Sequence, residues 1–498
     1  MDRYLYYPIT DYGALCDGST DDAAAFTRAI SACPAGGTVF VPAATVVGST
    51  ITVNKSLRVL GTGLSSVTAK ASAGIAPIFS ITADNVTIEW LKIDGNRANN
   101  GMSHGTGSAA IFVTANSFRL LSCELTGAFQ YGVELQPATS SSDILGFLFQ
   151  GNYIHDNGAN VDGGAGQNWG VGIQSFANGS KRPRRLRVIG NRFERNYSTY
   201  AASVGVNAFG AAVSGDMVDV VIVANDILDC YNGGGMIAES GANGIRRNWR
   251  IIGNHFELTA TDPAGSLSSG IECTGIGVII IGNTFVMLGQ YAAALQPIGA
   301  NDTSEWVFVG NHVYSCRGGV ASIASVTGGA KYVAVSGNVF DSITAGSLAV
   351  SLQQNDRFWS VGDNTFYNSV LPIYDPSNSA AISNNTGHVS SQAETALTLA
   401  NGDNNDISPS SSNIRISGPT AAFAITGIQG LYNYPGARLV FYNSTAQQLT
   451  IKNESASSTA ANRIKTLTGA NVVLRAGTSS FTVMYDSTDS RWILVGSN

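Results

Sequence analysis

The stretch VIGNRF, Val188–Phe193, recurs along the chain in closely similar form. Its clearest copies are IIGNHF (Ile251–Phe256), IIGNTF (Ile280–Phe285), FVGNHV (Phe308–Val313), VSGNVF (Val335–Phe340) and VGDNTF (Val361–Phe366). With two weaker copies included, the Asn of the phrase stands at positions 152, 191, 225, 254, 283, 311, 338 and 364. A repeat of this length is typical of stacked copies of one supersecondary unit. The sequence therefore predicts a solenoid.

Each unit of the solenoid reads as short strands rather than helices. No unit contains a ten-residue stretch with 3.6 periodicity, and Gly190-Asn191 breaks the alternation between Val188 and Phe193 as a bend between two strands does. A second alternating run follows in each unit, as in Gly170–Gln174. Short strands joined by sharp bends predict an all-β fold, a right-handed parallel β-helix.

The recurring Asn is expected to form a ladder along one bend of the coils. Its side-chain amide can donate to one neighbouring coil and accept from the other, which satisfies side chain and backbone together. An ordinary turn residue is the alternative interpretation of any single Asn. A series that stays in register over many coils favours the ladder.

Composition and charge fit this fold and exclude other classes of function. The chain has 498 residues, of which 12% are charged and 57 are Gly, as expected for a long solenoid rich in turns. The net charge is −6, and the dense basic run Lys181–Arg187 is interpreted as a solvated coil edge, so nucleic acid is not an expected partner. No cofactor or metal is expected, because neither the Cys nor the His residues have ligand spacing.

The cysteines and the N-terminus indicate in which cellular compartment the chain is made. The six cysteines are expected to be free thiols, mostly buried, with Cys123 at a ladder position and Cys273 pointing inward. The start MDRYLYYPITDYGA lacks the basic and apolar regions of a signal peptide, and no apolar run approaches the ~20 residues of a membrane helix. Synthesis in a reducing cytosol without membrane insertion is the expectation.

Residues 1–60 do not contain the recurring phrase. Asp21 is predicted to cap a helix that ends near Ala32, with Ala23, Phe26 and Ile30 on one face. Strands are expected over residues 38–41, 51–53 and 57–60. A lone amphipathic helix before a solenoid is interpreted as a cap over the open first coil.

This N-terminal segment also carries a family resemblance. The matching motifs are Asp11-Tyr12-Gly13-Ala14, Asp17-Gly18, Thr20-Asp21-Asp22, Ala29-Ile30, Gly36-Gly37-Thr38-Val39 and Val41-Pro42. They resemble the segment that leads into the β-helix of the pectate-lyase-like superfamily. The resemblance implies that the β-helix occupies residues 61–391, and it bears on fold more than on activity.

Residues 392–498 are expected to form a separate domain. Alternating runs such as Arg438–Asn443, Leu449–Asn453 and Arg491–Gly496, with turns between them, predict an antiparallel β-sandwich. The phrases LVFYN, LTIKN and MYDSTDSRWILVG resemble the C-terminal domains of bacteriophage tail spikes and tail fibres. The resemblance implies a trimerisation domain and a homotrimer; a carbohydrate-binding module is the alternative.

Together the resemblances imply a bacteriophage tailspike depolymerase. Such a protein would be part of the virion tail, would contact other phage tail proteins, and would bind and cut a bacterial surface polysaccharide such as capsule, O-antigen or exopolysaccharide. The polygalacturonase-type motif of clustered Asp with Gly-His-Gly is absent. The resemblance therefore supplies a fold and a role without a catalytic template.

Candidate catalytic residues follow from the chemistry of glycoside hydrolysis. The reaction usually needs two carboxyl groups, about 5 Å apart in retaining enzymes and about 6.5–9.5 Å apart in inverting ones. Neighbouring coils, about 4.8 Å apart, can provide such a pair. Aligning the second strand of each unit puts Glu239 and Glu272 on consecutive coils of one outward face, with Asp216 after the strand before them. These three acids are the predicted catalytic residues; a solvated surface acid is the alternative for each.

Substrate-binding residues are expected on the same face. Glu134 lies four coils from Glu272, roughly 19 Å away, which is too far to form a catalytic pair. Long segments near residues 155–169, 196–204 and 258–269 are expected to build the rim of a binding side. The predicted substrate-binding residues are Glu134, Trp169, Gln174, Asn207 and Tyr200.

Two other functions remain open from the sequence. A polysaccharide lyase would need a base, for which Tyr131, His155 and Tyr291 are candidates without a supporting motif. A non-catalytic adhesin would bind the glycan without shortening it. The low charge and the outward Gln residues are compatible with such an adhesin.

Overall fold

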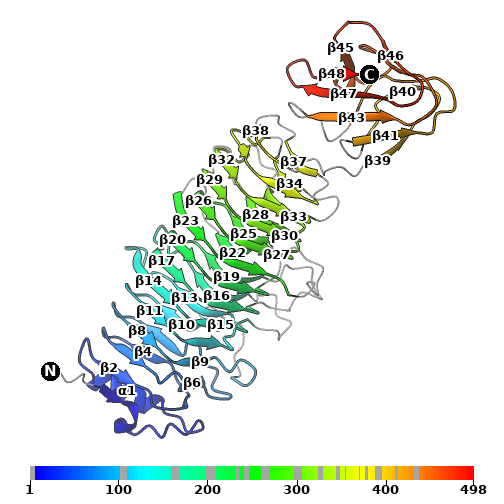
Figure 1. Ribbon diagram of the computed structural model, residues 1–498. Helices are drawn as coiled ribbons and strands as arrows, with labels where there is room; N and C mark the ends of the chain where they lie inside the picture. Colours follow the sequence, from blue (N-terminus) through cyan, green and yellow to red (C-terminus); the bar gives the residue numbers. More distant parts are fainter. Residues whose placement is uncertain are drawn as a thin grey trace.

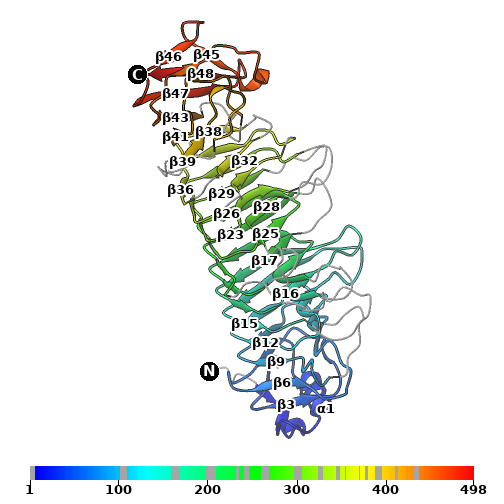
Figure 2. The same ribbon diagram turned by 90° about the vertical axis from the view of Figure 1, so that its right-hand side faces the viewer.

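The structure is a computed structural model. It describes residues 6–100, 109–158, 169–196, 209–230, 235–239, 246–259, 269–295, 305–323, 329–343, 348–353, 355–368, 371–375, 380–386, 395–409, 413–429 and 437–498. The molecule is elongated, with its single α-helix of the described part near the N-terminus and a separate β-domain at the C-terminal end (Figures 1 and 2). Three long parallel sheets, here called A, B and C, run along the axis between these ends.

The chain passes from sheet C to sheet A to sheet B in every coil. Sheet A consists of β1 (Tyr6–Pro8), β2 (Thr38–Phe40), β5 (Arg58–Leu60), β8 (Thr87–Glu89), β11 (Arg119–Leu121), β14 (Ile144–Gln150), β17 (Pro183–Ile189), β20 (Val218–Val223), β23 (Arg246–Ile252), β26 (Ile276–Ile281), β29 (Trp306–Val309), β32 (Val333–Ser336), β35 (Ser360–Gly362) and β38 (Ala381–Ser383). Sheet B consists of β3 (Thr45–Val47), β6 (Ser66–Ala69), β9 (Lys92–Asp94), β12 (Glu124–Thr126), β15 (Tyr153–His155), β18 (Arg192–Glu194), β21 (Asp226–Leu228), β24 (His255–Glu257), β27 (Thr284–Val286), β30 (His312–Tyr314), β33 (Val339–Asp341) and β36 (Thr365–Tyr367).

Sheet C completes the coil and later carries the candidate site. It consists of β4 (Ile51–Val53), β7 (Phe79–Ile81), β10 (Ala109–Val113), β13 (Tyr131–Leu135), β16 (Trp169–Ser175), β19 (Phe209–Gly215), β22 (Gly235–Glu239), β25 (Ser269–Cys273), β28 (Tyr291–Leu295), β31 (Gly318–Ser322), β34 (Leu348–Ser351) and β37 (Leu371–Tyr374). The winding fits a right-handed β-helix, since parallel strands joined by crossovers take that hand almost always. The predicted fold class is confirmed.

The interior is a continuous apolar core of stacked side chains. Buried residues of the three sheets form one cluster along the β-helix. Ring stacking repeats within it, with centroids 4.8 Å apart for Phe256 and Phe285 and 5.2 Å apart for Phe340 and Phe366. These Phe residues end the recurring phrase, so the phrase supplies the core of each coil as well as its bend.

The predicted asparagine ladder is present at the bend between sheets A and B. Asn254 shows the pattern: its Nδ2 donates to Asn283 Oδ1 and to the Ile222 carbonyl, both at 3.0 Å. Its Oδ1 accepts from the backbone N–H and the Nδ2 of Asn225, at 3.0 and 2.8 Å. The side-chain bonds run from Asn152 to Asn385, one coil beyond the predicted series. Cys123 precedes the ladder, and its backbone N–H donates to Asn152 Oδ1.

The residue before each ladder Asn explains the recurring Gly-Asn pair. Gly253 has a left-handed φ of 61°, and Ala224 takes the same conformation with a φ of 53°. The ladder Asn itself is not in that region, so it is not selected as a left-handed turn residue. The preceding position turns the chain, and the Asn side chain then bonds the coils.

The N-terminal helix matches its prediction in extent and orientation. The α1 helix (Ala23–Ala32) follows the short 3₁₀ segment η1 (Ile9–Tyr12) and buries Ala23, Phe26 and Ile30. The Phe26 ring packs edge-on against the Phe79 ring of β7, with the ring centroids 5.7 Å apart. The N-cap residue is Asp22, one position after the predicted cap. The helix thus covers apolar side chains of the first coils, and strands β2, β4 and β5 lie where the sequence predicts them.

The C-terminal domain has two sheets with a separate core. The six-stranded sheet contains β39 (Thr395–Thr398), β41 (Asn413–Ser417), β43 (Arg438–Asn443), β47 (Ser479–Asp486), β48 (Arg491–Ser497) and β45 (Ile464–Thr466). The four-stranded sheet contains β40 (Gly402–Asn404), β42 (Phe423–Ile425), β44 (Leu449–Ile451) and β46 (Val472–Leu474), and the 3₁₀ segment η2 (Ala460–Asn462) precedes β45.

Strand direction in this domain differs from the antiparallel prediction. The pairs β39–β41–β43 and β40–β42–β44 are parallel, whereas β43–β47–β48 and β44–β46 are antiparallel. The chain therefore alternates between the two sheets as a narrower solenoid before it closes with antiparallel strands. Alternation of apolar and polar residues reports that one face of a strand is buried, and this pattern is the same for either direction.

All six cysteines are free thiols, and five of them are buried, as predicted. In the described part of the chain, no helix is long and apolar enough to span a lipid bilayer.

Candidate functional site

One column of residues on the outward face of sheet C contains two of the predicted site acids. Strand register places in this column, rung by rung, Phe112, Glu134, Gln174, Ser214, Ala238, Glu272 and Ala294. The neighbouring inward column holds Val133, Ile173 and Ile271 in the core. Glu134 and Glu272 therefore lie on one face, separated by four rungs, roughly 19 Å, as the sequence predicts.

Glu134 is an unusual acid for the outside of a solenoid. Glu134 is only 4% exposed, and its Oε2 has no hydrogen-bond partner among the residues that the structure describes. Burial raises the pKa of this carboxyl from its ordinary value of 4.5 to about 7. A buried carboxyl without a partner is far cheaper to keep neutral than charged.

Gln174, on the next rung, explains how a neutral Glu134 can be accommodated. Gln174 Nε2 donates to the Ser175 carbonyl at 2.9 Å, and its buried Oε1 has no partner within the described part of the chain. A protonated Glu134 carboxyl carries an O–H donor, which is what Gln174 Oε1 lacks. We expect the two groups to bond when Glu134 is protonated and to lose that bond when it ionises.

This pairing predicts a pH-dependent stability that Glu134→Gln removes. Because the folded state holds the proton more tightly than the unfolded state, the wild-type free energy of unfolding should fall as pH rises from about 4.5 to about 7, by roughly 3 kcal/mol. Glu134→Gln stays neutral and can donate to Gln174 at any pH. Chemical unfolding should show the variant to be more stable than the wild type at pH 8 and similar at pH 4. An equal difference at both pH values would contradict the pairing.

Glu272 is half-buried on the same face. Burial raises the pKa of its carboxyl above the ordinary value. Its neighbours in the column are Ala238 and Ala294, whose side chains have no donor to stabilise a carboxylate. Glu272 is therefore a partly accessible acid that holds its proton more tightly than an acid in water does, a property that suits a proton donor.

Glu239 occupies a different register from the one aligned in the sequence. The predicted outward placement of Glu239 requires Met236 to pair with Ile271. In the structure β22 pairs Ile237 with Ile271, so that Ala238 pairs with Glu272 and Glu239 with Cys273. The shift is one residue, because the glycine run Gly233–Gly235 offers several equivalent anchors for the alignment. This register puts Glu239 in the column of Leu135 and Cys273, which lie in the core, so the prediction that Glu239 shares the outward face with Glu272 is wrong. The side chain of Glu239 lies outside the described residues.

Asp216, the third predicted catalytic acid, is committed to ion pairs where sheet C leads into sheet A. Its carboxylate accepts from Arg182 Nε at 2.8 Å and from Arg247 Nη1. The Arg247 side chain is fully buried, and that of Asp216 is 19% exposed. Two guanidinium partners suit a carboxylate that holds a buried arginine in place.

Replacing Asp216 with Asn should therefore lower stability more than it changes chemistry. Loss of a charged partner of buried Arg247 is expected to reduce the free energy of unfolding by about 3 kcal/mol. Denaturant unfolding measures this effect. The matched control is Asp226→Asn, since Asp226 is an exposed strand carboxylate with no ion pair shown in the described residues. If the two variants are equally stable, the assignment of a structural role to Asp216 is wrong.

The other predicted binding residues can be placed only in part. The backbone of Trp169 pairs with Phe209 at the start of β16, but the Trp169 side chain lies outside the described residues. Asn207 and Tyr200 also lie outside them, as do most of the three long segments expected to form the rim.

The candidate bases of a lyase differ in their surroundings. His155 is on sheet B, where its ring stacks on Tyr153 and its Nδ1 lies 2.6 Å from Asp156 Oδ2. Tyr131 is on sheet C beside Glu134, and burial together with the Glu134 charge raises the pKa of its hydroxyl. A raised pKa makes Tyr131 harder to ionise and so a weaker candidate base. Among the described residues, no group of three or more His, Cys, Asp or Glu side chains is arranged to hold a metal ion.

Comparison with known families agrees with this architecture. Residues 6–234 match the family model described as "Rhamnogalacturonase A/epimerase, pectate lyase-like". The match covers the N-terminal part of the chain, whose fold is a parallel β-helix. No curated protein matches the sequence significantly.

Several solved structures are similar to this chain at low sequence identity. The catalytic unit of the GH87 α-1,3-glucanase of Streptomyces thermodiastaticus is 16% identical, with a TM-score of 0.51, over 78% of this chain and 69% of that chain. The Dettilon tailspike protein gp208 is 16% identical, with a TM-score of 0.48, over 96% and 78%. ORF18 of Geobacillus virus E2 is 19% identical, with a TM-score of 0.42, over 77% of this chain and only 62% of that chain.

Sequence reasoning assigned Glu134 only to substrate binding and missed its burial and raised pKa. One signal was available: the same column has Phe112 on the rung below, and Tyr131 stands three residues earlier in the strand. Large side chains around an outward position can bury a carboxyl on a solenoid face. A pectate-lyase-like β-helix thus carries two acids with raised pKa on sheet C.

Proposed function

We propose that this chain binds a polysaccharide on the outward face of sheet C and cleaves it as an endo-acting glycoside hydrolase. The observation that carries the proposal is the Glu134–Gln174–Ser214–Ala238–Glu272 column, where two acids have pKa values raised by burial. Buried polar atoms without partners are costly and concentrate at functional sites. The description of the matching family model supports a carbohydrate substrate.

In this proposal Glu272 is the proton donor. Its favoured protonated form can give a proton to the leaving glycosidic oxygen, which general-acid catalysis requires. No second carboxylate is assigned, because strand register pairs Glu239 with the core residue Cys273 and so takes that position off the outward face that carries Glu272. Trp169, Asn207 and Tyr200 are the proposed glycan-binding residues, and the buried pair Glu134 and Gln174 supports the same face from within. Asp216 keeps the adjoining turn in place.

Product analysis tests the reaction class. The protein is incubated with a panel of bacterial capsules and O-antigens, and both new reducing ends and ultraviolet absorbance are followed. A hydrolase generates reducing ends without absorbance. Absorbance from an unsaturated sugar would identify a lyase instead, and binding without any new ends over the whole panel would identify an adhesin.

We also propose that the chain is a trimeric tailspike that acts at the bacterial surface beside other tail proteins. Its support is the resemblance of the C-terminal phrases. Light scattering of the purified protein is expected to give three times the chain mass of 51.8 kDa. Removal of residues 392–498 should lower this mass to that of a monomer. A monomeric full-length protein would contradict the trimer and favour a carbohydrate-binding role for this domain.

A further inference from the structure

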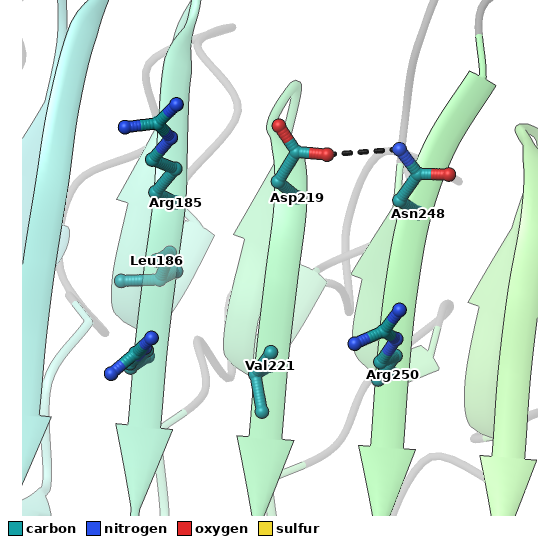
Figure 3. Close-up of a pocket in the computed structure, with 7 residues that line it drawn as sticks. Arg185, Leu186, Asp219, Val221, Asn248 and Arg250 are labelled. Carbon is teal, nitrogen blue, oxygen red and sulfur yellow. Dashed lines mark hydrogen bonds between the residues drawn. The ribbon is translucent and has the colours of Figure 1, made fainter.

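A shallow basic pocket lies on the outward face of sheet A, away from the column on sheet C. It has a volume of about 440 Å³ and spans β17, β20 and β23. Figure 3 shows Arg185, Asp219 and Asn248 on the three successive strands at one end of it, and Val221 and Arg250 further along the strands. Arg187 also lines the pocket, which therefore contains three arginines and one acid.

The acid in the pocket is already neutralised by other groups. Asp219 accepts from Asn248 Nδ2 at 2.9 Å and pairs with Arg184 Nη2 at 3.1 Å. Although partial burial acts in the opposite direction, these two partners hold the pKa of Asp219 below its ordinary value. The pocket therefore keeps an excess of positive charge on a chain whose net charge is −6.

The arginines continue as a row along the axis of the solenoid. Strand register places Arg119, Leu148, Arg187, Val221 and Arg250 in one column, so an arginine stands on every second rung. The spacing between successive arginines is roughly 10 Å. All three are exposed, and in the part of the chain that the structure describes no ion pair or hydrogen bond involves their guanidinium groups.

We propose that this row, Arg119, Arg187 and Arg250, is a binding site for an acidic polysaccharide, with the carboxylates of its sugars on the guanidinium groups. Guanidinium is planar and binds carboxylate through two parallel hydrogen bonds. Between the arginines stand Leu148 and Val221, whose apolar side chains leave an extended surface on which sugar rings can lie. A linear polymer with regularly repeated charges matches a row of regular period better than a compact anion does.

The inference deepens the proposed function, on which it rests for the kind of ligand, and names a second, non-catalytic face. It also revises the reading of Lys181–Arg187 as only a solvated coil edge. Arg182 and Arg184 of that run are held in ion pairs, whereas Arg187 points into the open row. A site on sheet A would keep an acidic polymer attached while the face of sheet C acts on it.

Binding of labelled polygalacturonate tests the inference, with neutral dextran of matched length as the reference polymer. The measurement uses the full chain carrying Glu272→Gln, so that affinity is read whether or not the polymer is a substrate. Polygalacturonate should bind at least about tenfold more tightly than dextran, and added salt should weaken it. Arg187→Ala with Arg250→Ala should weaken binding at least about tenfold, since each removes a charge-assisted hydrogen-bonding group. Arg317→Ala, which removes one positive charge at an exposed bend outside the row, should have little effect.

Three outcomes would overturn the inference. The first is equal affinity for polygalacturonate and dextran. The second is unchanged affinity in the double arginine variant. The third is tighter binding of duplex DNA than of polygalacturonate, which would make the row a general polyanion surface. None of these affects the proposed function, which fails on separate results: an unsaturated product, no new reducing ends, or normal cleavage by the Glu272 variant.

Discussion

Glu272→Gln is expected to lower the rate of polysaccharide cleavage by about 10²–10⁴-fold, the usual contribution of a positioned general acid. The amide has nearly the size of the carboxyl but no proton to give to the leaving oxygen. Because Glu272 has Ala238 and Ala294 as its column neighbours, the substitution breaks no hydrogen bond within that column. Reducing-end kinetics with the wild-type substrate measure the effect, and the thermal unfolding temperature should stay close to that of the wild type.

Glu257→Gln is the matched control for this prediction. Glu257 lies half-buried on β24, in the preceding coil, but on sheet B. The same chemical change there should leave cleavage within about twofold of the wild type, since sheet B is not part of the proposed site. A Glu272→Gln variant that retains half of the wild-type rate would remove Glu272 from the mechanism. Loss of activity in both variants would point to a general effect of the substitution.

Asn254→Ala is expected to destabilise the protein by about 4 kcal/mol. The change leaves the backbone N–H of Asn225 without its acceptor and the Ile222 carbonyl without its side-chain donor. It also removes one of the acceptors of Asn225 Nδ2, which keeps its bond to the Val188 carbonyl. Each buried group left unpaired costs roughly 1–3 kcal/mol. Guanidinium unfolding measures the loss, and the yield of soluble protein gives a second readout if the variant folds poorly.

Asn54→Ala is the control for the ladder. Asn54 is exposed, and in the described part of the chain its side chain makes no hydrogen bond. Its substitution should change the free energy of unfolding by less than about 0.5 kcal/mol. Asn254→Gly separates the ladder from a turn requirement, because glycine satisfies any turn but bonds to no coil. Wild-type stability of Asn254→Gly would contradict the ladder.

The ladder could be predicted because one residue type recurs with the same flanking residues on every coil. Asn385 was missed because its phrase, Ile382–Thr386, lacks both the Gly and the final apolar residue. A second pair was missed at another bend, where Asn157 Nδ2 donates to Asn196 Oδ1 at 2.9 Å. These residues stand five positions after Asn152 and Asn191, so counting from the recurring Asn would have located them.

The site was harder to predict than the fold, for two physical reasons. Register within sheet C depends on where each strand starts, and a glycine run before Met236 fits two registers that differ by one residue. Burial of Glu134 depends on side chains from other strands and from the surrounding segments, which alternation along one strand does not report. Polar residues such as Asp216 can serve an ion pair or catalysis, and only their neighbours distinguish the two.

The most direct test of the central claim is mass spectrometry of a polysaccharide digest made by the wild-type protein, by Glu134→Gln and by Glu272→Gln. The account predicts saturated oligosaccharides, each a whole number of repeats plus one water, from the wild type. It also predicts intact polymer with Glu272→Gln and slower cleavage with Glu134→Gln. Wild-type product yields from both variants, or unsaturated products that lack the added water, would contradict hydrolysis on the face of sheet C.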